Sequence, residues 1–112
     1  MSGQPLSPGG LDVSSSTDDG AVTVTLRGEL DLASVPTLEE RLIELEQSLP
    51  PRILIDLTAL TFIDSSGLRV LLLADGRARE QQRELIFTDS TTTVRRVLEM
   101  TGALDLLRFQ SR

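Results

Sequence analysis

Short apolar runs alternate along this chain with segments whose apolar residues recur every three or four positions, and this alternation constrains the fold most. The runs Ile53–Leu57 and Leu85–Phe87 are typical of buried parallel strands. Helical spacing occurs before, between and after them. Strands that alternate with helices imply right-handed crossovers and a mainly parallel sheet. We therefore predict an α/β fold, in the order β-β-α-β-α-β-α-β.

The first two strands are predicted to form an N-terminal hairpin. Apolar and polar residues alternate over 11–14 and again over 22–27, and the turn residues Asp18-Asp19-Gly20 lie between. The preceding segment, 1–10, contains three glycines, two prolines and two serines without periodicity. We expect a flexible leader over 1–10 and one folded domain over 11–112.

Three helices and a last strand complete the prediction. The first helix is expected over 34–48, where Ser34 can cap it and Pro50-Pro51 stops it. The second is expected over 66–82, and the third after Ser90-Thr91 with Gly102 as its C-terminal stop. Residues 106–109 are predicted to form the last strand.

The composition excludes several classes of function. The chain has no histidine, lysine or cysteine, so the usual general base, the Schiff-base amine and most transition-metal ligands are missing. We predict no enzyme activity, no catalytic residue, no metal and no cofactor. A net charge of −6 has the wrong sign for binding nucleic acid. With no long apolar run and no cysteine, we expect a cytoplasmic protein that does not enter a membrane.

Three loops are predicted to meet at one edge of the sheet. In parallel α/β sheets, the loops that follow the strands open at the carboxyl edge, where ligands and partners usually dock. These loops are 28–34, 58–66 and 88–91. They carry Ser65 and the candidate partner-binding residues Glu29, Asp31, Asp64, Ser66, Asp89 and Ser90.

The segment Asp64-Ser65-Ser66-Gly67 has two compatible interpretations. It stands immediately before a helix, so the simplest role of its side chains is to cap the first turn. A helix N-terminus also tolerates a phosphate, because free amides and the positive end of the helix dipole face it. Glu29 and Asp31 are interpreted as solvated turn residues, since nothing near them in the sequence completes a catalytic set.

Three stretches of the sequence resemble the STAS domain of bacterial anti-sigma factor antagonists. They are Gly28-Glu29-Leu30-Asp31, the segment from Leu57 through Asp64-Ser65-Ser66-Gly67-Leu68, and Met100-Thr101-Gly102 with Phe109. The resemblance covers nearly the whole chain from Leu11 to Phe109, and its strongest part is 62–68.

The resemblance implies a partner-switching cycle. Ser65 falls on the serine that the anti-sigma factor, itself a GHKL-type serine kinase, phosphorylates in that family. The unphosphorylated protein is then expected to bind the kinase and free a sigma factor. Phosphorylation would release it, and a serine phosphatase would reset it. Asp31, Asp64, Ser66 and Gly67 map onto the kinase-facing surface.

Two points stay open at this stage. The alternative function is that of a STAS scaffold or transporter-associated subunit in which Ser65 acts only as a cap. The chain also departs from the family pattern, because it ends almost immediately after Phe109, where family members commonly have a further helix. The sequence leaves the oligomeric state undetermined.

Overall fold

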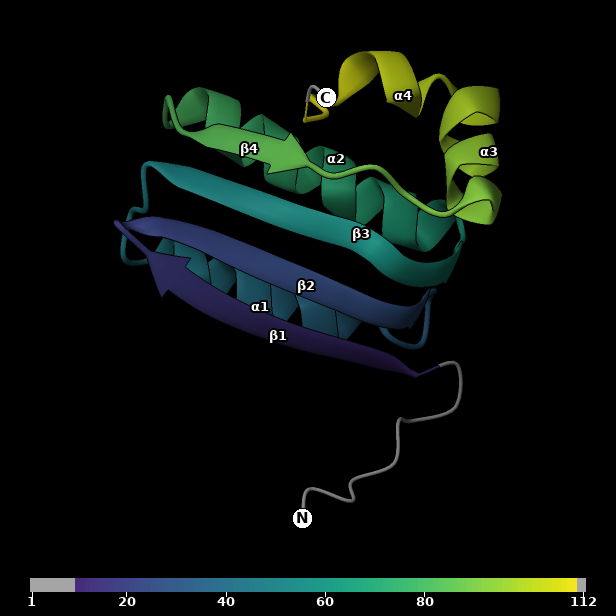
Figure 1. Ribbon diagram of the computed structural model, residues 1–112, viewed down its shortest axis with the longest axis horizontal. Helices are drawn as coiled ribbons and strands as arrows, with labels where there is room; N and C mark the ends of the chain where they lie inside the picture. Colours follow the sequence, from purple (N-terminus) through teal and green to yellow (C-terminus); the bar gives the residue numbers. More distant parts are fainter. Residues whose placement is uncertain (1–9, 111–112) are drawn as a thin grey trace.

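A computed structural model describes residues 10–110 of the chain, which form a four-stranded sheet with helices (Figure 1). The elements are β1 (Leu11–Asp18), β2 (Ala21–Leu30), α1 (Val35–Glu46), β3 (Arg52–Ile63), α2 (Ser65–Glu80), β4 (Glu84–Phe87), α3 (Thr92–Thr101) and α4 (Ala103–Leu106). The strand order is β1-β2-β3-β4; β1 runs antiparallel to β2, and the other neighbours are parallel. The predicted α/β class and the mainly parallel sheet are confirmed.

The N-terminal hairpin turns at Asp19 and Gly20, as predicted. Both residues have positive φ, 53° and 80°. Two consecutive positive φ angles give a turn whose twist matches that of the flanking strands, and Asp-Gly is a favoured pair for it. The turn pairs β2 with the full length of β1, from Leu11 opposite Gly28 to Asp18 opposite Ala21.

The two long helices cover one face of the sheet. In Figure 1, α1 lies behind β1 and β2, and α2 lies behind β3 and β4. Alternate residues of the central strands are buried on this face and pack against the apolar sides of both helices. They include Val22, Val24, Leu26, Leu30, Ile53, Ile55, Leu57, Leu60 and Ile63. A bidentate ion pair joins the helices: the Arg77 guanidinium donates to the Glu46 carboxylate at 2.7 and 2.9 Å.

The helices lie close to their predicted positions. The first begins one residue later and ends two residues earlier than expected, and α2 begins at Ser65 rather than Ser66. The third ends at Gly102, whose φ of 82° is the left-handed conformation that stops a helix.

The third strand is longer than predicted. The sequence interpretation ended it at Leu57 and placed 58–66 in a loop, but β3 continues to Ile63 and pairs with β2 as far as Leu30. Thr58 and Thr61 interrupt the apolar pattern after Leu57, and this hid the rest of the strand. The pairing with β2 also shifts register twice, which breaks the simple alternation of buried and exposed residues. Leu60 and Ile63 are buried and keep the extension attached to the core.

The prediction of a last strand over 106–109 is wrong. After Gly102 the chain forms the short helix α4, and Phe109 makes only an isolated bridge with Phe87. The left-handed turn at Gly102 redirects the chain into a new helical turn, which buries Ala103 and Leu107 and leaves Leu106 exposed. Phe109 then packs its ring on that of Phe87, with centroids 5.7 Å apart.

Two further predictions, the leader and the absence of a membrane span, can be compared only with residues 10–110. The leader predicted over 1–10 lies outside them except for Gly10, whose carbonyl accepts a hydrogen bond from the Glu29 amide at 3.0 Å. None of the helices within 10–110 is both long enough and apolar enough to cross a membrane.

Candidate partner-binding site

The end of β2 bends at Gly28, and this bend positions the first site loop. Gly28 has φ of +109° and coincides with a register shift between β2 and β3. A Cβ at this position would lie 2.3 Å from the Gly10 carbonyl oxygen. Only glycine fits both the angle and the contact. Beyond the bend, Glu29 is exposed and β2 stays paired with β3 as far as Leu30, after which the chain enters the loop 31–34.

Asp31 and Ser34 close this loop on each other. The Ser34 amide donates to the Asp31 carboxylate at 3.1 Å, and the Asp31 amide donates to the Ser34 hydroxyl oxygen at 3.0 Å. The same hydroxyl donates to the Glu29 carbonyl at 2.8 Å. Because Ser34 is buried, these bonds fix the loop from within and hold the Asp31 carboxylate at the start of α1.

Asp64 joins the first loop to the start of α2. One of its carboxylate oxygens accepts from the Gly67 amide at 2.9 Å and so caps the helix; the other accepts from the Leu32 amide at 3.2 Å. The Asp64 amide donates to the Leu30 carbonyl at 3.2 Å. The structure thus brings Asp31 and Asp64 to neighbouring positions, as the topology predicted.

Gly67 allows α2 to dock closely on the strand ends. It is buried, and a Cβ there would lie 2.6 Å from Leu30 Cγ, 2.7 Å from the Leu30 carbonyl oxygen and 3.0 Å from Ile63 Cγ1. A side chain at this position would push the first turn of the helix away from β2 and β3. Gly67 therefore lets the first turn of α2 pack directly on Leu30 and Ile63, which fixes the position of the site residues on that turn.

Ser65 is the first residue of α2 and its side chain is exposed. Asp64 makes the capping bond, so the Ser65 hydroxyl is not needed for it. Within residues 10–110 that hydroxyl makes no hydrogen bond. Ser66 is half-buried and lines a groove between α1 and α2.

This groove is the part of the site that sequence reasoning missed. It has a volume of about 300 Å³ and is lined by Leu32, Val35, Glu39, Ser66, Arg69, Val70 and Leu73. Leu32 and Leu73 expose 74% and 44% of their surfaces, so two large apolar side chains are accessible beside one groove. The available signal was Leu32 itself, a large apolar residue in a loop that begins with Asp31 and ends with Ser34.

The third predicted loop, 88–91, is attached further back along β3. The Thr91 hydroxyl donates to the Leu60 carbonyl at 2.8 Å, and the Thr88 hydroxyl contacts the Asp56 carboxylate at 3.3 Å. Leu60 precedes Asp64 by four residues, which is roughly 13 Å along an extended strand. Asp89 and Ser90, both half-buried, thus belong to a loop that is attached near Asp56 and Leu60.

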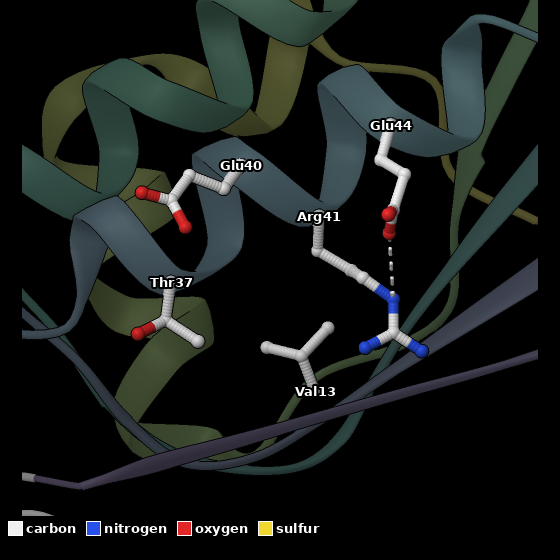
Figure 2. Close-up of a pocket in the computed structure, with 5 residues that line it drawn as sticks. All are labelled: Val13, Thr37, Glu40, Arg41 and Glu44. Atoms are coloured by element: carbon white, nitrogen blue, oxygen red, sulfur yellow. Dashed lines mark ion pairs between the residues drawn. The ribbon is translucent and has the colours of Figure 1, made fainter.

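A second hollow lies between β1 and α1 (Figure 2) and has a different character. Figure 2 shows Val13 facing a row of side chains from α1: Thr37, Glu40, Arg41 and Glu44. Arg41 is 3.9 Å from the Glu44 carboxylate and donates to the Ser15 hydroxyl oxygen at 3.2 Å. The residues that line this hollow include none of those around Asp64 and Ser65, so we do not place the functional site there.

The match to a known family is decided by the sequence as a whole. The family model described as the STAS domain matches residues 12–112, nearly the full chain. The chain belongs to the STAS domain family. In the part of this STAS domain that the structure describes, no group of three or more carboxylate, histidine or cysteine side chains could hold a metal ion.

Named relatives of this STAS domain are anti-sigma factor antagonists. The anti-sigma-B factor antagonist of Staphylococcus aureus is 30% identical over 97 residues, which cover 87% of this chain and 90% of the relative. A solved anti-sigma factor antagonist from Mycobacterium paratuberculosis has a TM-score of 0.85 at 23% identity, over 96% of this chain and 92% of that one. Such antagonists are regulatory binding proteins and not enzymes, which is the class predicted from the sequence.

A third neighbour has been solved in two states. SpoIIAA of Bacillus, an anti-sigma factor antagonist, has TM-scores of 0.68 and 0.67 to this STAS domain in its unphosphorylated and phosphorylated forms. The identities are 24% and 19%; each comparison covers 91% of this chain, and 89% and 92% of SpoIIAA. The two forms of SpoIIAA thus share this fold to the same degree.

Proposed function

We propose that this STAS domain is an anti-sigma factor antagonist that binds an anti-sigma factor of the GHKL serine kinase class and so frees a sigma factor. Phosphorylation of Ser65 by that kinase releases the complex, and a serine phosphatase restores the binding form. The name of the Staphylococcus aureus relative and the two forms of SpoIIAA support this proposal.

The exposed, unbonded hydroxyl of Ser65 carries the proposal. Phosphoryl transfer forms a bond between this oxygen and the γ-phosphorus of ATP, breaks the bond from that phosphorus to the β,γ-bridging oxygen, and releases ADP. The hydroxyl proton passes to a base of the kinase. Asp64 holds the start of α2 without using this hydroxyl, so the reaction removes no hydrogen bond from the described fold.

The added charge is large for such a small surface. A phosphoserine adds about −1.5 to −2 charges at neutral pH. The carboxylates of Asp31 and Asp64 already lie in the joined loops, and the Asp64 oxygens are occupied by the amides of Gly67 and Leu32. A like-charge contact in an interface costs several kcal/mol, and each ~1.4 kcal/mol changes affinity tenfold. One phosphoryl group is therefore enough to release a partner.

The first experiment locates the modification. The protein is incubated with its candidate kinase and ATP, and the modified residue is identified by mass spectrometry. We expect one phosphoryl group on Ser65 and none on the Ser65→Ala variant. Modification at another serine, or capture of a membrane transporter rather than a kinase from cell extract, would refute this assignment.

The second experiment measures the switch. Calorimetry with the kinase should show that Ser65→Asp binds at least about 100-fold more weakly than the unmodified protein, because the carboxylate brings negative charge into the interface. Ser65→Ala should bind normally but stay bound when ATP is added. Circular dichroism serves as the control, since both variants should be folded. Tight binding by Ser65→Asp would contradict the mechanism.

A further inference from the structure

Arg69 lies one helical turn after Ser65 on the same face of α2. Residues four apart in a helix are surface neighbours, with Cβ atoms about 6 Å apart. Long side chains in a helix lean back toward its N-terminus, which directs Arg69 over the first turn and toward Ser65. Both residues are exposed. The guanidinium is therefore within reach of a group attached to the Ser65 oxygen.

Arg69 also differs from the other arginines of its helix in having no ion pair. Arg77 binds the Glu46 carboxylate, and Arg79 donates to the Asp75 carboxylate at 2.7 Å. No carboxylate of the described chain lies within 4.0 Å of the Arg69 guanidinium. Glu39 of α1 lines the same groove but does not reach ion-pair distance. The charged guanidinium of Arg69, with its N–H donors, is thus available beside Ser65.

We propose that Arg69 binds the phosphoryl group of phosphorylated Ser65 within the same helix. This inference rests on the proposed function, because it requires the phosphorylated state. A guanidinium donates two parallel hydrogen bonds to a phosphate, an arrangement that lysine does not reproduce. Since Arg69 lines the groove beside Leu32 and Leu73, the pair holds the phosphoryl group at the mouth of that groove.

The test uses protein with phosphoserine encoded at position 65, so that no kinase is needed. A ³¹P NMR titration reports the pH midpoint at which the phosphoryl group takes up its second proton, which is about 6 for an ordinary phosphoserine. A neighbouring guanidinium favours the dianion and lowers this midpoint. We expect Arg69→Gln to raise it by about half a pH unit or more, and Arg69→Lys to raise it by less.

Arg79→Gln is the matched control. It removes the same charge from the same helix, but roughly 20 Å along the helix from Ser65, where salt screens its effect on the phosphoryl group. The inference is overturned if Arg69→Gln leaves the midpoint unchanged or shifts it no more than Arg79→Gln does. That result would leave partner switching intact. Conversely, if phosphorylation never alters kinase binding, the proposed function fails while the titration still reports on Arg69.

Discussion

The two long helices both begin beside a serine at the same edge of the sheet, and the two serines are used in opposite ways. Ser34, before α1, is buried with 3% of its surface exposed, and its hydroxyl bonds to the Glu29 carbonyl and the Asp31 amide. Ser65, at the start of α2, is exposed and its hydroxyl bonds to nothing in the described chain. One serine holds a loop together, and the other is open to reaction.

The difference comes from which residue caps each helix. Asp64 occupies the capping position of α2 and accepts from the Gly67 amide, which moves Ser65 into the first turn and frees its side chain. The α1 cap position holds Ser34, which makes no capping bond and instead closes the loop behind it. A serine beside a helix N-terminus is therefore a candidate for modification only when a neighbouring residue caps the helix in its place.

The largest effect on stability is expected at Gly67, the residue that lets the start of α2 pack on the sheet so that Ser65 faces outward. Gly67→Ala places a methyl group 2.6 Å from Leu30 Cγ and 2.7 Å from the Leu30 carbonyl oxygen. We expect the free energy of unfolding to fall by about 2 to 3 kcal/mol, because the first turn must move away from β2. Chemical denaturation measures the change.

Gly76→Ala in the same helix provides the control for that variant. A Cβ at Gly76 meets no atom within 4 Å, so alanine should stabilise the helix by about 0.5 to 1 kcal/mol. If both variants change stability equally, close docking of the α2 start on Leu30 is not what Gly67 provides.

The next prediction compares the two serines directly. Ser34→Ala removes an acceptor from the Asp31 amide and a donor from the Glu29 carbonyl, and we expect a loss of about 1 to 2 kcal/mol in unfolding free energy. Ser65→Ala removes no bond of the described fold and should stay within about 0.5 kcal/mol of the wild type. Thermal and urea denaturation of the pair measure both. Equal losses of unfolding free energy would contradict the difference between the roles of Ser34 and Ser65.

The sequence was sufficient to predict the α/β class, the hairpin and the helix positions, because each depends on local patterns. The turn at Asp19-Gly20 and the stop at Gly102 are examples. The end of β3 and the C-terminal segment were missed. β3 continues past Leu57 through register shifts that depend on its partner β2, and Phe109 is placed by its contact with Phe87. Such features arise from pairing between distant segments.

The candidate site was predictable to the same extent. Topology correctly grouped the loops after β2 and β3, and the hydrogen bond from Leu32 to Asp64 joins them. It did not reveal that β4 ends at Phe87, opposite Ile55, so that the third loop begins well before the end of β3. Knowing which edge a loop occupies does not give its position along that edge. The groove beside Arg69 also required the packing of α1 against α2.

The smallest expected effect concerns Asp56, which anchors the third loop as Asp64 anchors the first. Burial raises the pKa of Asp56, but hydrogen bonds from the Thr58 hydroxyl and amide and from the Thr88 hydroxyl outweigh it, so the pKa is lowered from its ordinary value of 3.8. A carboxyl group with a lowered folded-state pKa contributes stability above pH ~4, and this contribution is lost as the pH falls through the folded-state value.

Thr58→Val removes the hydroxyl that donates to Asp56 at 2.6 Å and leaves the amide bond at 2.9 Å in place. The pKa of Asp56 should therefore rise part of the way toward 3.8, so the stability that Asp56 contributes above pH ~4 should be smaller, and its loss in acid should be complete at a slightly higher pH. NMR titration of the carboxyl carbon measures this. Thr61→Val is the control, because its hydroxyl donates to the Gly28 carbonyl instead. An Asp56 pKa that responds equally to both variants would show that the Thr58 hydroxyl does not hold the Asp56 carboxylate that binds Thr88 of the third loop, and the resemblance to the Asp64 anchor would be lost.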